Sequence, residues 1–191
     1  MNKGRMEAFS DGVLAIIITI MVLGLAAPHD SSPKSLTPLI PVFLSYLLSF
    51  INLGIYWSNH HHLLQAASRV DGRVLWANLH LLFWLSLFPF GTEWMGENNF
   101  SRWPVILYGV ILLLAAIAYF MLAKSLVSLH GKESVISAAL GRDFKGKFSV
   151  AIYLAAIPAS FLNRWIGLAL YVLVAVMWLV PDRRVERTLA R

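Results

Sequence analysis

The sequence predicts an all-α integral membrane protein, with six transmembrane helices in a single domain over residues 1–191. Hydrophobic residues make up 58% of the chain and charged residues only 14%, whereas about 25% charged residues is usual in soluble domains. A soluble globule of this length could not bury so much apolar surface, which excludes a soluble enzyme, a disordered tail and a nucleic-acid module. The chain contains no cysteine, which excludes disulfides and thiolate chemistry.

Three apolar segments in the first half of the chain are candidates for crossing the bilayer, whose hydrocarbon of about 30 Å takes roughly 20 residues of helix. The first stops at Pro28, and the second starts after a cluster of prolines, because proline interrupts a helix. The third stops near Pro89 and Gly91. We therefore expect helices over residues 8–27, from just after Pro41 to about residue 66, and over residues 74–90.

The second half of the chain holds one long segment and two short ones. Residues 103–126 are long enough to span, and we expect a loop over about residues 128–147. Asn163 and Arg164 separate the last two segments, 148–162 and 166–180, and 15 helical residues measure only about 22 Å. This pair either spans with snorkelling flanks or forms a re-entrant hairpin, and both alternatives return the chain to the same side.

The positions of the basic residues predict that both termini lie in the cytoplasm. With the N-terminus inside, 13 of the 16 Lys and Arg residues fall on the inner side, and Lys34, Arg102 and Arg164 fall on the outer side. Lys and Arg favour the cytoplasmic side of membrane proteins. The net charge of +6 therefore reflects topology, and we expect a multi-pass protein of the cell membrane whose surroundings are lipid, with no nucleic-acid partner.

The first segment carries a polar signal and an apolar stripe. Asp11 lies about one turn inside the apolar run, where a carboxylate needs a partner such as Arg5 or the helix N-terminus. At about 100° per residue, six residues of this segment lie on one face of the helix and form a stripe. Asp11 points about 130° away from the centre of that face. The stripe consists of Phe9, Gly12, Ile16, Thr19, Ile20 and Leu23.

The run Arg5-x-x-x-Phe9-Ser10-Asp11, followed by Gly12 and an Ile/Thr-rich helix, resembles the signature of the transmembrane protein 175 family of potassium channels. The resemblance covers essentially the whole chain. It implies a homotetramer in which four first helices line a central pore, without the Thr-Val-Gly-Tyr-Gly filter of ordinary potassium channels. That filter is also missing from this sequence.

The resemblance implies a role for each matched residue. Ile16 corresponds to the apolar constriction and Thr19 to the pore threonine, while Ile20 and Leu23 fall where further hydrophobic rings are expected. Such rings exclude water when they narrow, so they act as a hydrophobic gate. We expect a leak-type channel with a modest preference for potassium over sodium, potassium as the permeant ion, and no cofactor.

Histidines at the end of the second segment suggest a polar network rather than a metal centre. Consecutive helical residues point about 100° apart, so the run from His60 to His62 cannot converge on one metal, and His80 would have to approach from the next helix. We expect His60 or His61, Asn78 and His80 to hold the first helix by hydrogen bonds at the level of Ser10 and Asp11.

Other function classes have weaker support. A secondary transporter would show inverted repeats or paired broken helices, together with a coupling carboxylate near the bilayer midplane. An intramembrane enzyme would need converging acid, base or metal groups, and only the histidine run competes for that role. A transporter, or an intramembrane scaffold or enzyme, is therefore the alternative to an ion channel.

Overall fold

The computed structural model describes residues 2–131, 134, 137 and 144–179, and every regular element in that part of the chain is helical. Asn2 caps the first helix, because its Oδ1 accepts a hydrogen bond of 3.0 Å from the Gly4 amide. In chain order the elements are α1 (Lys3–Leu23), the 3₁₀ helix η1 (Pro33–Leu39), α2 (Ile40–Gln65), α3 (Gly72–Ser86), α4 (Phe88–Glu97), α5 (Arg102–His130), α7 (Phe144–Leu162) and α8 (Arg164–Leu179).

All six predicted segments are helical, but several of their ends differ from the prediction. α1 begins at Lys3 and ends at Leu23, short of residue 27. The predicted loop over residues 128–147 is shorter among the described residues, because α5 continues to His130 and α7 already begins at Phe144. The last two helices are separated at Asn163, as the sequence predicted.

The predicted end of the third segment near Pro89 is wrong. Helix α3 stops at Ser86, and α4 resumes at Phe88 and runs to Glu97. Pro89 occupies the first turn of α4, where a backbone N–H would have no helical partner, so its missing donor costs little. Together the two helices form one interrupted span over Gly72–Glu97.

Four stretches among the described residues are long and apolar enough to cross a membrane: Lys3–Leu23, Pro33–Gln65, Gly72–Glu97 and Arg102–His130. Arg164–Leu179 is a shorter apolar helix. At 1.5 Å per residue, its 16 residues extend about 24 Å. The structure is therefore all-α and of multi-pass membrane type.

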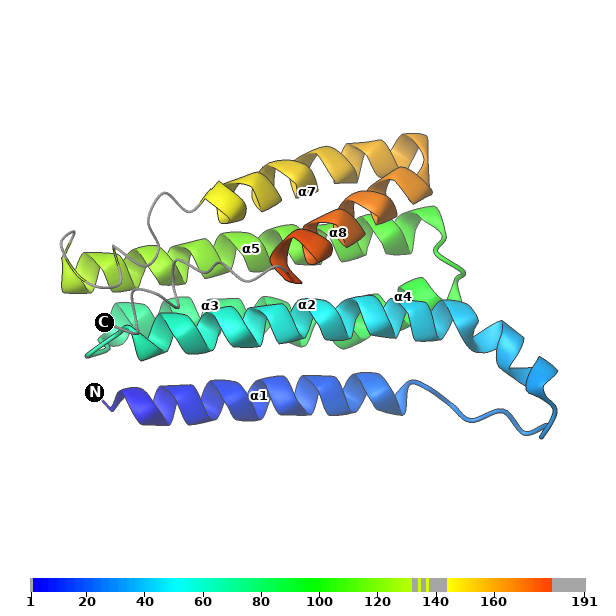
Figure 1. The fold of residues 1–191 in the computed structure, drawn as a ribbon, viewed down its shortest axis with the longest axis horizontal. Coiled ribbons are helices and arrows are strands. Elements are labelled where there is room, and N and C mark those ends of the chain that lie inside the picture. Colours follow the sequence, from blue (N-terminus) through cyan, green and yellow to red (C-terminus); the bar gives the residue numbers. More distant parts are fainter. Residues whose placement is uncertain (1, 132–133, 135–136, 138–143, 180–191) are drawn as a thin grey trace.

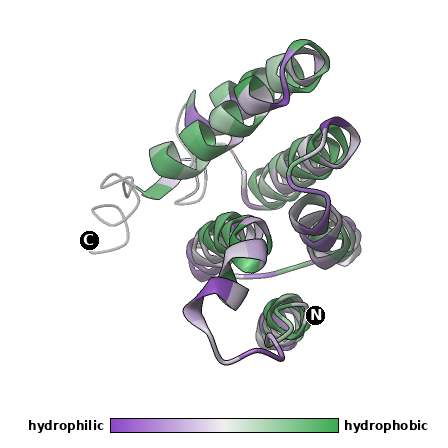
Figure 2. Cartoon of the chain, turned by 90° about the vertical axis from the view of Figure 1, so that its right-hand side faces the viewer, coloured by the Kyte–Doolittle hydropathy of each residue, from purple (hydrophilic) through white to green (hydrophobic). Residues whose placement is uncertain are grey.

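The helices run roughly parallel to one another, with α1 at one edge of the bundle and α7 and α8 at the other (Figures 1 and 2). α5 lies between these edges and contacts α3, α4, α7 and α8. α1 contacts α2, α3 and α4 only with its inward side. One helix of the bundle is thus peripheral in the isolated chain, although its sequence is as apolar as a membrane span requires.

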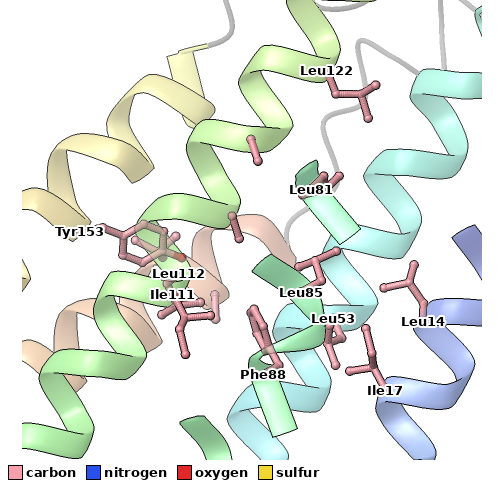
Figure 3. Close-up of a cluster of buried hydrophobic side chains, with 14 of the residues drawn as sticks. Leu14, Ile17, Leu53, Leu81, Leu85, Phe88, Ile111, Leu112, Leu122 and Tyr153 are labelled. Carbon is pink, nitrogen blue, oxygen red and sulfur yellow. The ribbon is translucent and has the colours of Figure 1, made fainter. Parts of the chain in front are cut away.

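The core fills the space between the helices from α1 to α8 with interlocking aliphatic and aromatic side chains (Figure 3). Leu53, Leu85 and Phe88 are fully buried there, and α1 adds Leu14 and Ile17. Helix association in lipid depends on close packing and hydrogen bonds, because lipid tails are as apolar as the side chains. This core therefore holds the inward side of α1 by shape.

Glycines and hydroxyls bring the helices of the bundle close together. A Cβ at Gly109 of α5 would overlap the Tyr171 hydroxyl of α8, and one at Gly167 would overlap Ser160 of α7. The Ser49 hydroxyl lies 2.9 Å from the Tyr108 hydroxyl and accepts a 2.6 Å hydrogen bond from Thr92, which links α2, α4 and α5. These contacts hold α2, α4, α5, α7 and α8 together.

Candidate functional site

The two faces of α1 have different surroundings. Its buried side chains recur at steps of three or four residues, which is the spacing of a single helical face. That face points toward α2, α3 and α4, and its members are Met6, Ser10, Leu14, Ile17 and Met21. Because five buried positions account for one side only, the other side of α1 has no partner within the described chain.

The uncovered side of α1 is the stripe that the sequence predicted. Phe9 is 55% exposed, Ile16 61%, Ile20 51% and Leu23 76%, and Gly12 and Thr19 are exposed between them. At about 100° per residue these six residues centre about 130° away from the buried face. The structure therefore leaves an exposed strip on the edge of the bundle, apolar except for the Thr19 hydroxyl.

Thr19 presents its hydroxyl oxygen on this strip. Its Oγ1 donates a hydrogen bond of 2.9 Å to the Ala15 carbonyl one turn earlier. Because the hydroxyl proton is used within the helix, the oxygen lone pairs remain available on the exposed side. The group can therefore accept from water or contact a cation, and it carries no charge.

Ser10, Asn78 and His60 form a buried chain of hydrogen bonds across α1, α3 and α2. Asn78 Nδ2 donates to Ser10 Oγ over 2.9 Å, and Ser10 Oγ donates to the Met6 carbonyl over 2.8 Å. His60 Nε2 lies 2.7 Å from Asn78 Oδ1, which can only accept. His60 therefore carries its proton on Nε2, and its buried Nδ1 has no hydrogen-bond partner among the described residues.

A second set of contacts joins α1 to α2 on the flank. The Glu7 carboxylate lies 3.3 Å from His61 Nδ1, and Asp11 Oδ1 accepts a 3.1 Å hydrogen bond from Trp57 Nε1. The rings of Trp57 and His61 stack at 6.2 Å between centroids. At the start of α1, Lys3 Nζ donates to two carbonyls at the end of α2, those of Leu64 and Ala67, at 3.0 Å each.

Two predicted contacts are not present. Asp11 was expected to have a basic partner such as Arg5, but Arg5 is exposed and the described residues give Asp11 a neutral indole donor instead. His80 was expected in the network around Ser10, but its Nε2 accepts a 2.9 Å hydrogen bond from Trp84 Nε1, one turn along its own helix. The local i to i+4 pair outcompetes the contact between helices because it needs no precise interhelical register.

The sequence contained a signal for the flank contacts that the prediction missed. Glu7 and Asp11 are four residues apart on α1, and Trp57 and His61 are four residues apart on α2. In antiparallel helices, two i to i+4 pairs on facing sides meet in reverse order, so Glu7 lies against His61 and Asp11 against Trp57. The facing pairs form a ladder at the inner half of α1.

The three consecutive histidines have separate environments. His60 is buried against Asn78, and His61 lies on the flank against Glu7. The ring of His62 meets that of His61 edge-on at 5.7 Å between centroids. No group of three or more His, Asp or Glu side chains that could hold a metal ion occurs among the residues that the structure describes.

Acidic residues lie at the opposite end of the bundle from Lys3. Glu93 and Glu97 are exposed on α4, and Asp30 precedes η1. Asp30 accepts hydrogen bonds from the Ser32 hydroxyl at 2.6 Å and from the Ser32 amide at 3.1 Å. These donors hold the pKa of the Asp30 carboxyl below its ordinary value, so the Asp30 side chain is negatively charged at neutral pH.

Comparisons with known proteins place this arrangement among ion channels. The sequence model of the family described as "Endosomal/lysosomal potassium channel TMEM175" matches residues 5–89. A protein named as a potassium channel in Chryseobacterium sp. (strain P1-3) is 52% identical over 189 residues, which cover 99% of this chain and 98% of that one. Another, from Streptomyces collinus, is 28% identical and covers 93% of this chain and 91% of that one.

A solved structure is similar over nearly the same extent. The crystal structure of a lysosomal potassium-selective channel TMEM175 homolog from Chamaesiphon minutus superposes with a TM-score of 0.81 at 29% identity. The superposition covers 93% of this chain and 96% of that chain. The region matched by the family model, residues 5–89, includes nearly all of α1. It also includes all three residues of the hydrogen-bonded set Ser10, Asn78 and His60.

Proposed function

The chain belongs to the TMEM175 family of potassium channels, and on that premise we propose that it is a potassium-selective, leak-type cation channel made of four identical chains. Four copies of α1 line its central pathway. Members of this family are channels and not enzymes, and no covalent chemistry is required of any residue. The channel preference for potassium over sodium is modest, because the pathway holds hydroxyls and apolar side chains and no charged filter.

The observation that carries this proposal is the uncovered stripe on α1. A single chain packs the inward face of α1 completely and leaves Ile16, Ile20 and Leu23 more than half exposed. A lone helix at the edge of a bundle cannot enclose a pathway, so the pathway needs several copies around one axis. Four copies are the arrangement that the family resemblance of the α1 signature implies.

In the proposed channel, the gate is a hydrophobic constriction. Rings of Ile16, Ile20 and Leu23 from four chains would surround the axis at successive turns of α1. Water leaves a narrow apolar ring, and an ion then meets a barrier because it must lose hydration without receiving ligands. A small outward movement of α1 re-wets the rings and opens the path.

Thr19 is the proposed selectivity residue. In a tetramer it contributes four hydroxyl oxygens at one level, each with its proton directed to Ala15 and its lone pairs free. Neutral oxygen ligands replace part of the hydration shell of an ion, and a weakly hydrated ion loses less hydration energy than a strongly hydrated one. This difference favours potassium over sodium without a large energetic penalty for either.

The buried and flanking contacts of α1 are the proposed structural support. Ser10, Asn78 and His60 hold the inward face, while Glu7–His61 and Asp11–Trp57 hold the flank. Arg5 and Phe9 of the signature are exposed in the single chain and are available for contacts between chains. We propose a multi-pass protein of the cell membrane with both termini cytoplasmic, supported by the excess of Lys and Arg on that side.

The test is ion flux through the purified protein in liposomes, with gradients of potassium, sodium or chloride, combined with native mass measurement. We expect potassium flux above sodium flux, negligible chloride flux, and a particle of four times the 21.4 kDa of one chain. An active dimer or monomer would contradict the pore of four α1 helices. Equal chloride and potassium flux would contradict the cation pathway.

A further inference from the structure

A half-open crevice of about 250 Å³ lies away from α1, between α2 and the helices of the opposite edge. It is enclosed by residues from α2, α5, α7 and the end of α8, and none of its lining residues belongs to α1 or α3. For scale, an engineered dry cavity of about 150 Å³ in another protein is large enough to hold benzene. The crevice is therefore large enough for part of an apolar chain, and it is separate from the proposed pore.

The walls of the crevice are apolar over most of its surface. Ile55 of α2, Ile117 and Phe120 of α5, and Val150 of α7 face into it. Trp178, near the end of α8, contributes its ring, and Tyr153 lines it from the third turn of α7. No Asp or Glu of the part of the chain that the structure describes belongs to its lining. An anion at this site would therefore meet no negative side chain of the described lining.

Its charged group lies at the end of α7 that we place on the cytoplasmic side. Lys147, in the first turn of α7, lines the crevice and is exposed, and it has no ion-pair partner among the described residues. Lys145 lies beside it on α7, with Nζ 5.7 Å from the centre of the Trp178 ring and 3.5 Å from the Met177 carbonyl. Positive charge thus stands at one end of an apolar slot, as an amphipathic anion requires.

We propose that this crevice binds an anionic glycerophospholipid of the inner leaflet, with one acyl chain between α2, α5 and α7 and the phosphate at Lys147. The assignment to the inner leaflet depends on the proposed orientation of the chain. The C-terminal residues 180–191 are a poorer occupant, because their sequence includes four arginines and is repelled by the same lysine. A zwitterionic lipid would gain the apolar contact and little from the charge.

The experiment is native mass spectrometry of the full-length protein in detergent, titrated with phosphatidylglycerol or with phosphatidylcholine. Lys147→Gln should weaken phosphatidylglycerol retention about fivefold, the usual contribution of one basic residue near an anionic headgroup. Arg73→Gln removes an exposed charge from the start of α3, outside the crevice, and should leave retention unchanged. Val150→Trp should fill the slot and reduce retention further, whereas Leu154→Trp, one turn along α7 on an exposed position, should not.

Size-exclusion profiles of all variants show whether each one still folds and assembles. Equal phosphatidylglycerol retention by the wild type, Lys147→Gln and Val150→Trp would overturn the proposal. Equal retention of both lipids by the wild type would also overturn it, because the crevice would then bind acyl chains without recognising charge. Lipid retention does not depend on ion flux, so a protein that binds the lipid but conducts no potassium would contradict the proposed channel function alone.

Discussion

Helices α1 and α5 are both long, apolar candidate membrane spans, but only α5 is largely buried by other helices of its own chain. In the most apolar 18-residue stretch of each helix, 56% of the residues of α5 are buried, against 28% for α1. α5 contacts helices on several sides, and α1 contacts them on one. Hydropathy and length make both helices candidate membrane spans, but burial distinguishes a helix that holds the bundle together from one that keeps a face for other contacts.

The largest expected difference lies between two adjacent isoleucines of α1. Ile17 is 3% exposed and Ile16 is 61% exposed. Ile17→Asn should lower the free energy of unfolding by about 4 kcal/mol, because it opens a cavity and buries an amide. Ile16→Asn should leave folding unchanged and raise resting potassium flux about tenfold, which corresponds to a barrier lower by about 1.4 kcal/mol.

Thermal unfolding followed by size exclusion measures the first effect, and liposome flux measures the second. If Ile16→Asn unfolds the protein while Ile17→Asn does not, the buried and exposed faces of α1 have been exchanged. If Ile16→Asn folds normally and its flux equals that of the wild type, Ile16 does not belong to the gate.

Substitution of one glycine in each helix compares how tightly α5 and α1 are packed. A Cβ at Gly109 overlaps the Tyr171 hydroxyl, while a Cβ at Gly12 has no neighbour within 4 Å in the isolated chain. Gly109→Ala should therefore destabilise the protein by about 1–3 kcal/mol, as overpacking of a core does. Gly12→Ala should leave the unfolding of the single chain unchanged. Equal unfolding temperatures for the two variants would contradict the difference between the helices.

Ser10 tests whether the inward face of α1 depends on hydrogen bonds as well as on shape. Ser10→Ala removes the acceptor of Asn78 Nδ2, and a buried donor without a partner costs about 1–2 kcal/mol. The matched control is Ser125→Ala on α5, where an exposed hydroxyl donates only to the Met121 carbonyl of its own helix. Thermal unfolding should separate the two variants, and equal stability would mean that the Asn78 amide finds another acceptor.

The smallest expected effect concerns selectivity. Thr19→Val should reduce the preference for potassium over sodium a few-fold, about 1 kcal/mol, while the amount of tetramer stays the same. Asp11→Ala removes the acceptor of Trp57 from the flank and should reduce assembly more than it changes ion preference. Reversal potentials and size-exclusion profiles of both variants measure this. Selectivity that changes in Asp11→Ala alone would place the pathway on the flank of α1.

The faces of α1 could be predicted from sequence because an α-helix has a fixed period. Residues 9, 12, 16, 19, 20 and 23 share one side of any regular helix, and the structure leaves that side uncovered. The interrupted third span was not predicted, because proline disfavours the interior of a helix but suits its first turn, and the sequence does not say which applies at Pro89.

Partners between helices were harder to predict, because they depend on register. The sequence offered several polar residues near Ser10, and only the packed structure shows that Asn78 and His60 meet it while His80 pairs with Trp84. The crevice beside Lys147 could not be predicted from the sequence either, since it depends on how α2, α5, α7 and α8 pack together.

The polar contacts of α1 are unevenly distributed along its length, although its buried apolar side chains continue as far as Met21. Lys3, Glu7, Ser10 and Asp11 tie the first three turns to α2 and α3. Beyond them, the polar contact to another helix among the described residues is a 3.7 Å approach of Thr92 Oγ1 to the Met21 sulfur. The polar contacts thus fix one half of α1, whereas the half that carries Ile20 and Leu23 is held chiefly by the apolar packing of Ile17 and Met21.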